Sequence, residues 1–114
     1  MDRKSCITEL LNFVVPLQGT IAKLHSWPRD APEPLAQLLT SHLLGALSRF
    51  LGGEVSANEI EDWANAIECR DDVEYSPESE VGMALHQLAN PFLTEPLTIA
   101  SARMLVARLS AGAT

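Results

Sequence analysis

The side chains that could do chemistry in this sequence are three histidines, two cysteines and a dense run of acids. His25, His42 and His86 lie on three separate segments, and none has the H-E-x-x-H spacing of a zinc enzyme. No G-x-S-x-G motif marks a serine nucleophile. We therefore predict that the protein is not an enzyme and has no catalytic residue, metal or cofactor. A small enzyme that uses one histidine as its acid or base is the weaker alternative.

The two cysteines, Cys6 and Cys69, are far apart in the chain and lack the spacing of metal ligands. They could form one disulfide bond. Reduced thiols are the favoured state, because the first residues lack the long apolar segment of an export signal. We expect both cysteines to serve as buried apolar side chains.

The acids are concentrated in one part of the chain. The net charge is −7, and ten of the fifteen acidic residues lie between Glu54 and Glu80, where Arg70 is the only base. Such a block repels phosphate groups, so we predict no direct binding to nucleic acid. A basic protein is the partner that it suits, because complementary charges steer association.

The acidic run from Asp71 to Glu78 could be read in two other ways. It holds four carboxylates within eight residues, and hard cations such as calcium prefer clustered carboxylates. The run lacks the D-x-D-x-D-G order of a calcium loop, although Glu74 and Glu78 could hold a metal from two turns. A solvated acidic loop is the commoner fate of such a run.

Tyr75 lies inside this run and is the aromatic side chain most suited to anchor a partner. Buried aromatic rings supply contact area at interfaces, while acids around them guide the approach of a basic surface. The predicted protein-binding residues come from an acidic helix and from the connector after it: Glu61, Asp62, Asp71, Asp72, Glu74 and Tyr75.

The clearest helix start in the chain positions the first of these acids. Ser56 and Glu59 have the S-x-x-E spacing of a capping box, in which each side chain accepts a free backbone N–H of the first turn. Val55 and Ile60 are spaced as a hydrophobic staple around it. The apolar stripe of this helix is Ile60, Trp63, Ala64 and Ile67.

Apolar residues recur at helical spacing through the rest of the chain. Pro16 interrupts the first helical segment, Pro34 suits the first turn of the second, and Ser76-Pro77-Glu78 suits the start of the fourth. Thr98 is placed to cap the last. We predict an all-α compact bundle of about five helices that forms one domain over residues 1–114, with the second helix central. The expected helices span residues 6–24 (kinked at Pro16), 34–51, 57–69, 77–89 and 98–110.

The apolar segments also bear on location and assembly. Each is interrupted well short of the roughly 18 residues that a membrane span needs, so we expect a cytoplasmic protein with no membrane contact. The second and last helices are rich in leucine, and they offer more apolar surface than a few short helices can cover. A homodimer is therefore a further hypothesis.

One phrase of about fifteen residues resembles a known group of proteins. The segment Phe50-Leu51-Gly52-Gly53-Glu54-Val55-Ser56-Ala57-Asn58-Glu59, followed by Asp62-Trp63-Ala64, is similar to a phrase in small acidic helical bacterial proteins. These include colicin-type immunity proteins and uncharacterised relatives. The resemblance implies an inhibitor whose acidic helix and loop bind a cationic toxin.

We favour the interpretation that the chain is a non-catalytic protein-binding module, of the immunity or inhibitor kind. A helical structural or oligomeric protein, whose acids confer only solubility, is the alternative.

Overall fold

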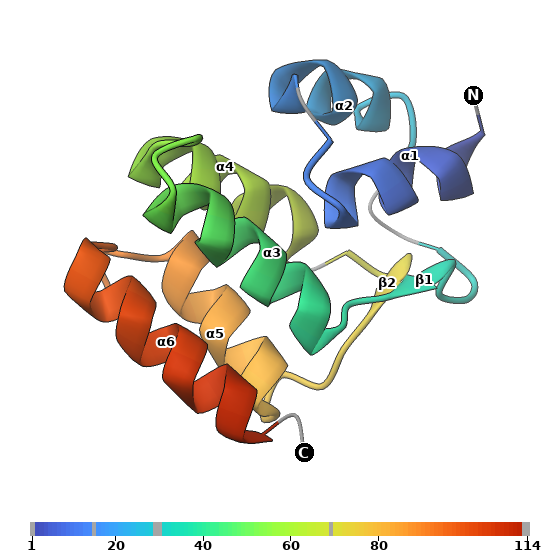
Figure 1. The fold of residues 1–114 in the computed structure, drawn as a ribbon. Coiled ribbons are helices and arrows are strands. Elements are labelled where there is room, and N and C mark those ends of the chain that lie inside the picture. Colours follow the sequence, from blue (N-terminus) through green and yellow to red (C-terminus); the bar gives the residue numbers. More distant parts are fainter. Residues whose placement is uncertain (1, 15, 29–30, 69, 113–114) are drawn as a thin grey trace.

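The computed structural model describes residues 2–14, 16–28, 31–68 and 70–112, which fold into a mainly helical body (Figure 1). Its radius of gyration of 13.3 Å is the value expected for a compact chain of this length. The described elements are α1 (Arg3–Leu11), α2 (Leu17–Leu24), β1 (Ala36–Gln37), α3 (Thr40–Leu51), α4 (Ala57–Ile67), β2 (Val73–Glu74), α5 (Glu80–Ala89) and α6 (Ile99–Gly112). The helical class of the prediction is confirmed, and the short pair of strands was not predicted.

The first predicted helix is divided into α1 and α2. The break begins at Phe13, whose φ of 54° lies in the left-handed region, and Pro16 precedes the first turn of α2. The strained backbone at Phe13 is held by packing, because its buried ring lies 5.6 Å from the ring of Trp63. Trp63 also donates a 2.6 Å hydrogen bond from Nε1 to the carbonyl of Leu10. The break is therefore anchored on α4.

The second predicted helix starts later than expected. Residues 36–37 form β1, which pairs in parallel with β2, and α3 begins only at Thr40. The backbone N–H groups of Leu35 and Leu38 donate to the carbonyls of Asp72 and Glu74, at 2.9 and 3.0 Å. These long-range bonds hold the segment extended and override the local helix signal at Pro34. From Thr40 onward, α3 packs against α4, α5 and α6 (Figure 1), as expected for a central helix.

Helix α4 follows its sequence pattern closely. The Ser56 hydroxyl accepts the N–H of Glu59 at 3.2 Å, and the Glu59 carboxylate accepts the N–H of Ser56 at 3.1 Å. The capping box is confirmed. All four residues of the predicted stripe are fully buried: Ile60, Trp63, Ala64 and Ile67.

Helix α5 begins at Glu80 rather than near Pro77, because Ser79 is its N-cap. The Ser79 hydroxyl accepts the N–H of Gly82 at 3.1 Å and donates to the carbonyl of Ser76 at 2.6 Å. Residues 76–78, which were expected to form the first turn of this helix, are therefore a separate turn that packs against the start of α5. A Cβ at Gly82 would lie 2.1 Å from the Ser76 carbonyl oxygen, so only glycine permits this close contact.

The start of the last helix agrees with its predicted cap. Thr98 caps α6, since its hydroxyl accepts the N–H of Ser101 at 3.1 Å.

Cys6 is a fully buried free thiol, whereas Cys69 lies outside the described residues. None of the helices that the structure describes is both long and apolar enough to cross a membrane.

Candidate functional site

The six predicted binding residues do not lie on one surface. Glu61 is half-buried and lines a groove beside α5, whereas Asp62 is exposed toward α2 and accepts a hydrogen bond from Gln18 Nε2 at 3.2 Å. Asp71 and Glu74 are exposed on the connector, and Tyr75 is half-buried. Three of the predicted residues line separate pockets: Glu61 beside α5, Asp62 beside α2, and Tyr75 on the connector side.

Asp72 requires a correction, because it is fully buried. Arg3 Nε donates to Asp72 Oδ2 at 3.0 Å, and Arg70 donates to both carboxylate oxygens at 2.9 and 3.2 Å. Burial alone would raise the pKa of Asp72, but the hydrogen bonds and charges of Arg70 and Arg3 outweigh it and lower that pKa. Asp72 is thus an ionised structural residue in the interior, and it is not part of an exposed acidic surface.

A groove lies between the first half of α4, the end of α5 and the link 91–97. Its volume is about 210 Å³, and Glu61 is the only charged residue among those that line it. The other lining residues are mostly apolar: Leu88, Pro91, Phe92, Pro96 and Leu97, with Ala57 and the amides Asn58 and Gln87. The groove is therefore an apolar depression with one carboxylate at its edge.

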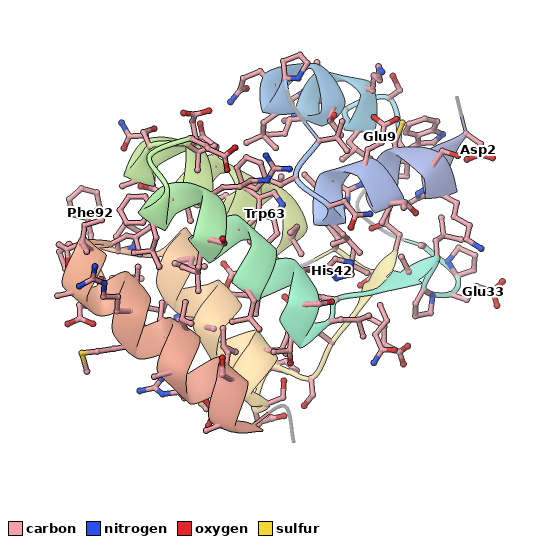
Figure 2. All side chains as sticks on the ribbon, viewed as in Figure 1. Asp2, Glu9, Glu33, His42, Trp63 and Phe92 are labelled. Carbon is pink, nitrogen blue, oxygen red and sulfur yellow. The ribbon has the colours of Figure 1, made fainter. Side chains whose placement is uncertain are left out.

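Phe92, which lines this groove, and its neighbour Leu93 are large apolar side chains exposed to solvent. Phe92 is 97% exposed and Leu93 is 80% exposed, and Figure 2 shows the Phe92 ring projecting from the edge of the molecule. Their loop is tied to the end of α5 by the Thr94 hydroxyl, whose single hydrogen is within reach of the carbonyls of Asn90 at 2.8 Å and Gln87 at 3.1 Å. The fold itself thus holds both side chains outward.

A second cavity lies beside Tyr75, at the other end of the same helix pair. It encloses about 280 Å³ and is lined by Glu68, Tyr75, Pro77, Gly82, Met83 and His86. Tyr75, Met83 and Pro77 form apolar walls, while Glu68 and His86 supply the charged and titratable groups.

Glu68, His86 and Asn90 form a hydrogen-bonded network at this cavity. Asn90 Nδ2 donates to Glu68 Oε1 at 3.1 Å and to the carbonyl of His86 at 2.9 Å, so both of its amide hydrogens are used. His86 Nδ1 lies 2.9 Å from Glu68 Oε2. A hydrogen bond there requires the proton on Nδ1, since a carboxylate can only accept.

The groove and the cavity are consecutive parts of one surface. Glu61 lies in the first half of α4 and Glu68 is the C-cap of the same helix. Their spacing of seven residues puts them on the same side, about two helical turns apart. Met83, His86, Gln87 and Asn90 share one face of α5 by the same rule. We call this surface the α4–α5 seam: Glu61, Glu68, Tyr75, Met83, His86, Gln87 and Phe92.

Sequence reasoning overlooked most of the seam. Phe92, with Leu93 beside it, falls between the expected helices 77–89 and 98–110, although an apolar pair between Pro91 and Pro96 is itself a sign of a rigid exposed loop. Glu68 and His86 gave no sequence signal as a pair, because they are eighteen residues apart and belong to different helices.

The other histidines belong to different places. His42 Nδ1 accepts the N–H of Leu39 at 2.9 Å at the start of α3, and its partial burial lowers its pKa. His25 is exposed after α2. Within the described part of the chain, no three His, Cys, Asp or Glu side chains are grouped so that they could hold a metal ion.

Comparison with known proteins gave no relative: no family model, no curated protein and no solved structure matches the chain. The resemblance to immunity proteins stays a prediction.

Proposed function

We propose that the chain is a non-catalytic protein-binding module whose α4–α5 seam receives a basic partner protein. The exposure of Phe92 and Leu93 beside the apolar groove carries this proposal. Burying a phenylalanine side chain stabilises a protein by about 2 kcal/mol. Here the loop holds the Phe92 ring in solvent, so the fold does not gain this stabilisation. Adjacent exposed apolar residues on a rigid loop are typical of an interface anchor.

The charge of the surrounding residues supports a basic partner. Glu61 lies at the groove and Glu68 at the Tyr75 cavity, while Glu95 is 3.5 Å from Gln87 of the seam. An apolar centre with acids around it resembles the core and rim of a protein interface. The exposed acids Asp62, Asp71 and Glu74 add to the field that attracts a cationic protein.

A finer form of the proposal makes the partner a cationic toxin and the chain its inhibitor. It rests only on the resemblance of residues 50–64 to immunity proteins. The seam does not depend on that resemblance, because its anchor is the apolar loop at Phe92.

Peptide display selection tests the proposed binding surface without knowledge of the natural partner. Peptides are selected on the wild-type protein and then measured against the double variant Phe92→Ser, Leu93→Ser. We expect enriched peptides to combine apolar residues with Lys or Arg, and to bind the variant at least about tenfold more weakly, since anchor residues at interfaces contribute 2 kcal/mol or more.

Met104→Ser is the matched control for this selection. Met104 is another exposed apolar side chain, 66% exposed on α6, so it changes surface polarity without touching the seam. Its peptide affinities should equal those of the wild type. Enrichment of acidic peptides, or equal binding to the double variant, would contradict the proposal.

A symmetric homodimer is a second candidate, in which the chain acts as an oligomeric structural protein. It is favoured by the exposure of Ile99 and Met104 on α6, at 46% and 66%, in addition to that of Phe92. Light scattering over a hundredfold concentration range decides this candidate: a constant monomer mass rejects it.

A further inference from the structure

We propose that the Tyr75 cavity is a subsite for a lysine or arginine side chain of the basic partner, which depends on the proposed protein-binding function of the seam. The occupant is an organic cation on an apolar stem. It would enter beside Tyr75 and Met83 and end at the Glu68 carboxylate.

The lining of the cavity matches the two parts of such a side chain. Tyr75, Met83 and Pro77 offer apolar walls to the methylene stem, as long basic side chains pack their stems on apolar surface. The aromatic ring also favours a cation over its face. Glu68, the one acidic residue of the lining, accepts the charged hydrogen-bond donors that a guanidinium or ammonium group carries.

Glu68 is held in place by its neighbours and is still reached by solvent. Asn90 Nδ2 lies 3.1 Å from one oxygen of the carboxylate and His86 Nδ1 lies 2.9 Å from the other. Its side chain is 21% exposed, so solvent and a ligand can still reach it. Because the neighbouring amide and imidazole fix the carboxylate, a cation that binds it has little ordering cost to overcome.

The opposite wall of the cavity is also fixed. A Cβ at Gly82 would lie 2.1 Å from the Ser76 carbonyl oxygen and 2.8 Å from Pro77 Cα. The segment 76–77 therefore rests directly on the backbone of α5, and the opening between Pro77 and Met83 has a defined width.

The groove and the cavity are spaced for one partner segment. Glu61 at the groove and Glu68 at the cavity are separated by seven residues, or about 10 Å along the α4 axis. A partner segment that contacts Glu61 at the groove would therefore meet Glu68 at the cavity about 10 Å further along.

A nuclear magnetic resonance titration with small probes tests the cavity directly. The probe is n-butylguanidinium, and n-butanol and butyrate are its neutral and anionic counterparts. We expect saturable shifts of the amide signals of Tyr75, Met83 and His86 with the cation, at least about tenfold weaker binding of butanol, and none of butyrate. Equal affinity for butanol and the cation would overturn the proposal, because the cavity would then be merely apolar.

Two variants test whether the cation binds in the Tyr75 cavity: one removes the charge of Glu68, and the other fills the cavity with a lysine side chain. Glu68→Gln should weaken the cation about tenfold, since hydrogen bonds to a charged group are worth about twice neutral ones. Glu33→Gln is the matched control, because Glu33 is exposed and lies on the side of the molecule away from Phe92 (Figure 2). Met83 is 44% exposed, so Met83→Lys should fold normally and place its own ammonium group in the cavity. Undiminished probe binding to Met83→Lys would contradict the assignment.

The selected peptides separate this inference from the proposed function. A bound peptide whose Lys is replaced by norleucine should lose about tenfold in affinity for the wild type and almost nothing for Glu68→Gln. If the replacement changes nothing while binding still requires Phe92, the subsite is wrong and the protein-binding proposal stands. If the cation probe fills the cavity but no peptide requires Phe92, the cation site stands and the proposed partner surface is wrong.

Discussion

Two carboxylates of the acidic block, Asp72 and Glu68, are four residues apart in the sequence and have opposite surroundings. Asp72 has no exposed surface and lies between the guanidinium groups of Arg3 and Arg70. Glu68 reaches solvent at a cavity, where its bonded neighbours are Asn90 and His86. The difference teaches that the density of acids along the chain does not locate a binding surface; the position of the arginines decides which acids are structural.

The structural role of Asp72 depends on contacts that are distant in the sequence. Arg3 is 69 residues away from it, and the same arginine donates from Nη2 to the carbonyl of Pro28 at 2.7 Å. The Asp72 carbonyl in turn accepts the N–H of Leu35 at 2.9 Å. One aspartate thus joins α1, the loop after α2 and the extended segment before α3.

Replacing Asp72 should have the largest effect on stability. Asp72→Asn leaves two arginines around a neutral group, and the loss of one partner from a buried ion cluster costs about 3 kcal/mol. Glu68→Gln should cost about 1 kcal/mol or less, because Glu68 is still reached by solvent and the glutamine side chain can keep a hydrogen bond to Asn90. Urea unfolding of the two variants compares them. Equal losses in the free energy of unfolding would contradict the distinction between Asp72 as a structural acid and Glu68 as an acid that reaches solvent.

Acid titration sharpens the same distinction. The pKa of Asp72 lies below its ordinary value of 3.8, so the unfolded chain binds a proton at a pH where the folded chain does not. The stabilisation by Asp72 is therefore present above about pH 4 and is lost as the pH falls through its folded pKa. Asp72→Asn should show a shallower fall in stability below pH 4 than the wild type does. Asp2 also has a lowered pKa, so the difference between the two proteins, rather than either curve alone, measures Asp72.

The far end of the same connector is fixed by close packing rather than by charge. Gly82→Ala should destabilise the fold by about 1–3 kcal/mol, as overpacking does, because the new methyl would overlap the Ser76 carbonyl. It should also weaken binding of n-butylguanidinium, since the wall of the Tyr75 cavity must move.

Gly45→Ala is the control for this substitution. No atom lies within 4 Å of a Cβ built at Gly45, and the residue is within α3. Alanine there should stabilise the protein by about 0.5–1 kcal/mol through its helix propensity. Thermal unfolding of both variants provides the comparison, and a destabilised Gly45→Ala would show that the effect at Gly82 is not specific to the close contact.

How well each region could be predicted from the sequence depends on how far apart in the chain its contacting residues are. The capping box at Ser56 and the stripe through Trp63 are local patterns, and both were predicted correctly. The extended segment before Thr40 and the burial of Asp72 arise from hydrogen bonds to residues far along the chain, which no local pattern carries. At α5 two local signals compete, since Ser76 and Ser79 both suit an N-cap; the close packing of the turn on Gly82 selects Ser79. The seam combines Glu61 and Tyr75, which were predicted, with Phe92, Glu68 and His86, which only the folded chain brings together.

The exposed loop of the seam should give the smallest change in stability and therefore the cleanest test of its role. The double variant Phe92→Ser, Leu93→Ser removes side chains that are 97% and 80% exposed, so little burial is lost and the free energy of unfolding should stay within about 0.5 kcal/mol of the wild type. The loop itself should persist, because its hydrogen bonds are made by the Thr94 hydroxyl and by backbone N–H groups, and not by the two apolar side chains. Urea unfolding measures the stability, and affinity for the selected peptides measures the function. A loss of stability near that of Asp72→Asn would mean that Phe92 and Leu93 are structural. The exposed loop of the seam would then not differ in its contribution to stability from the buried surroundings of Asp72.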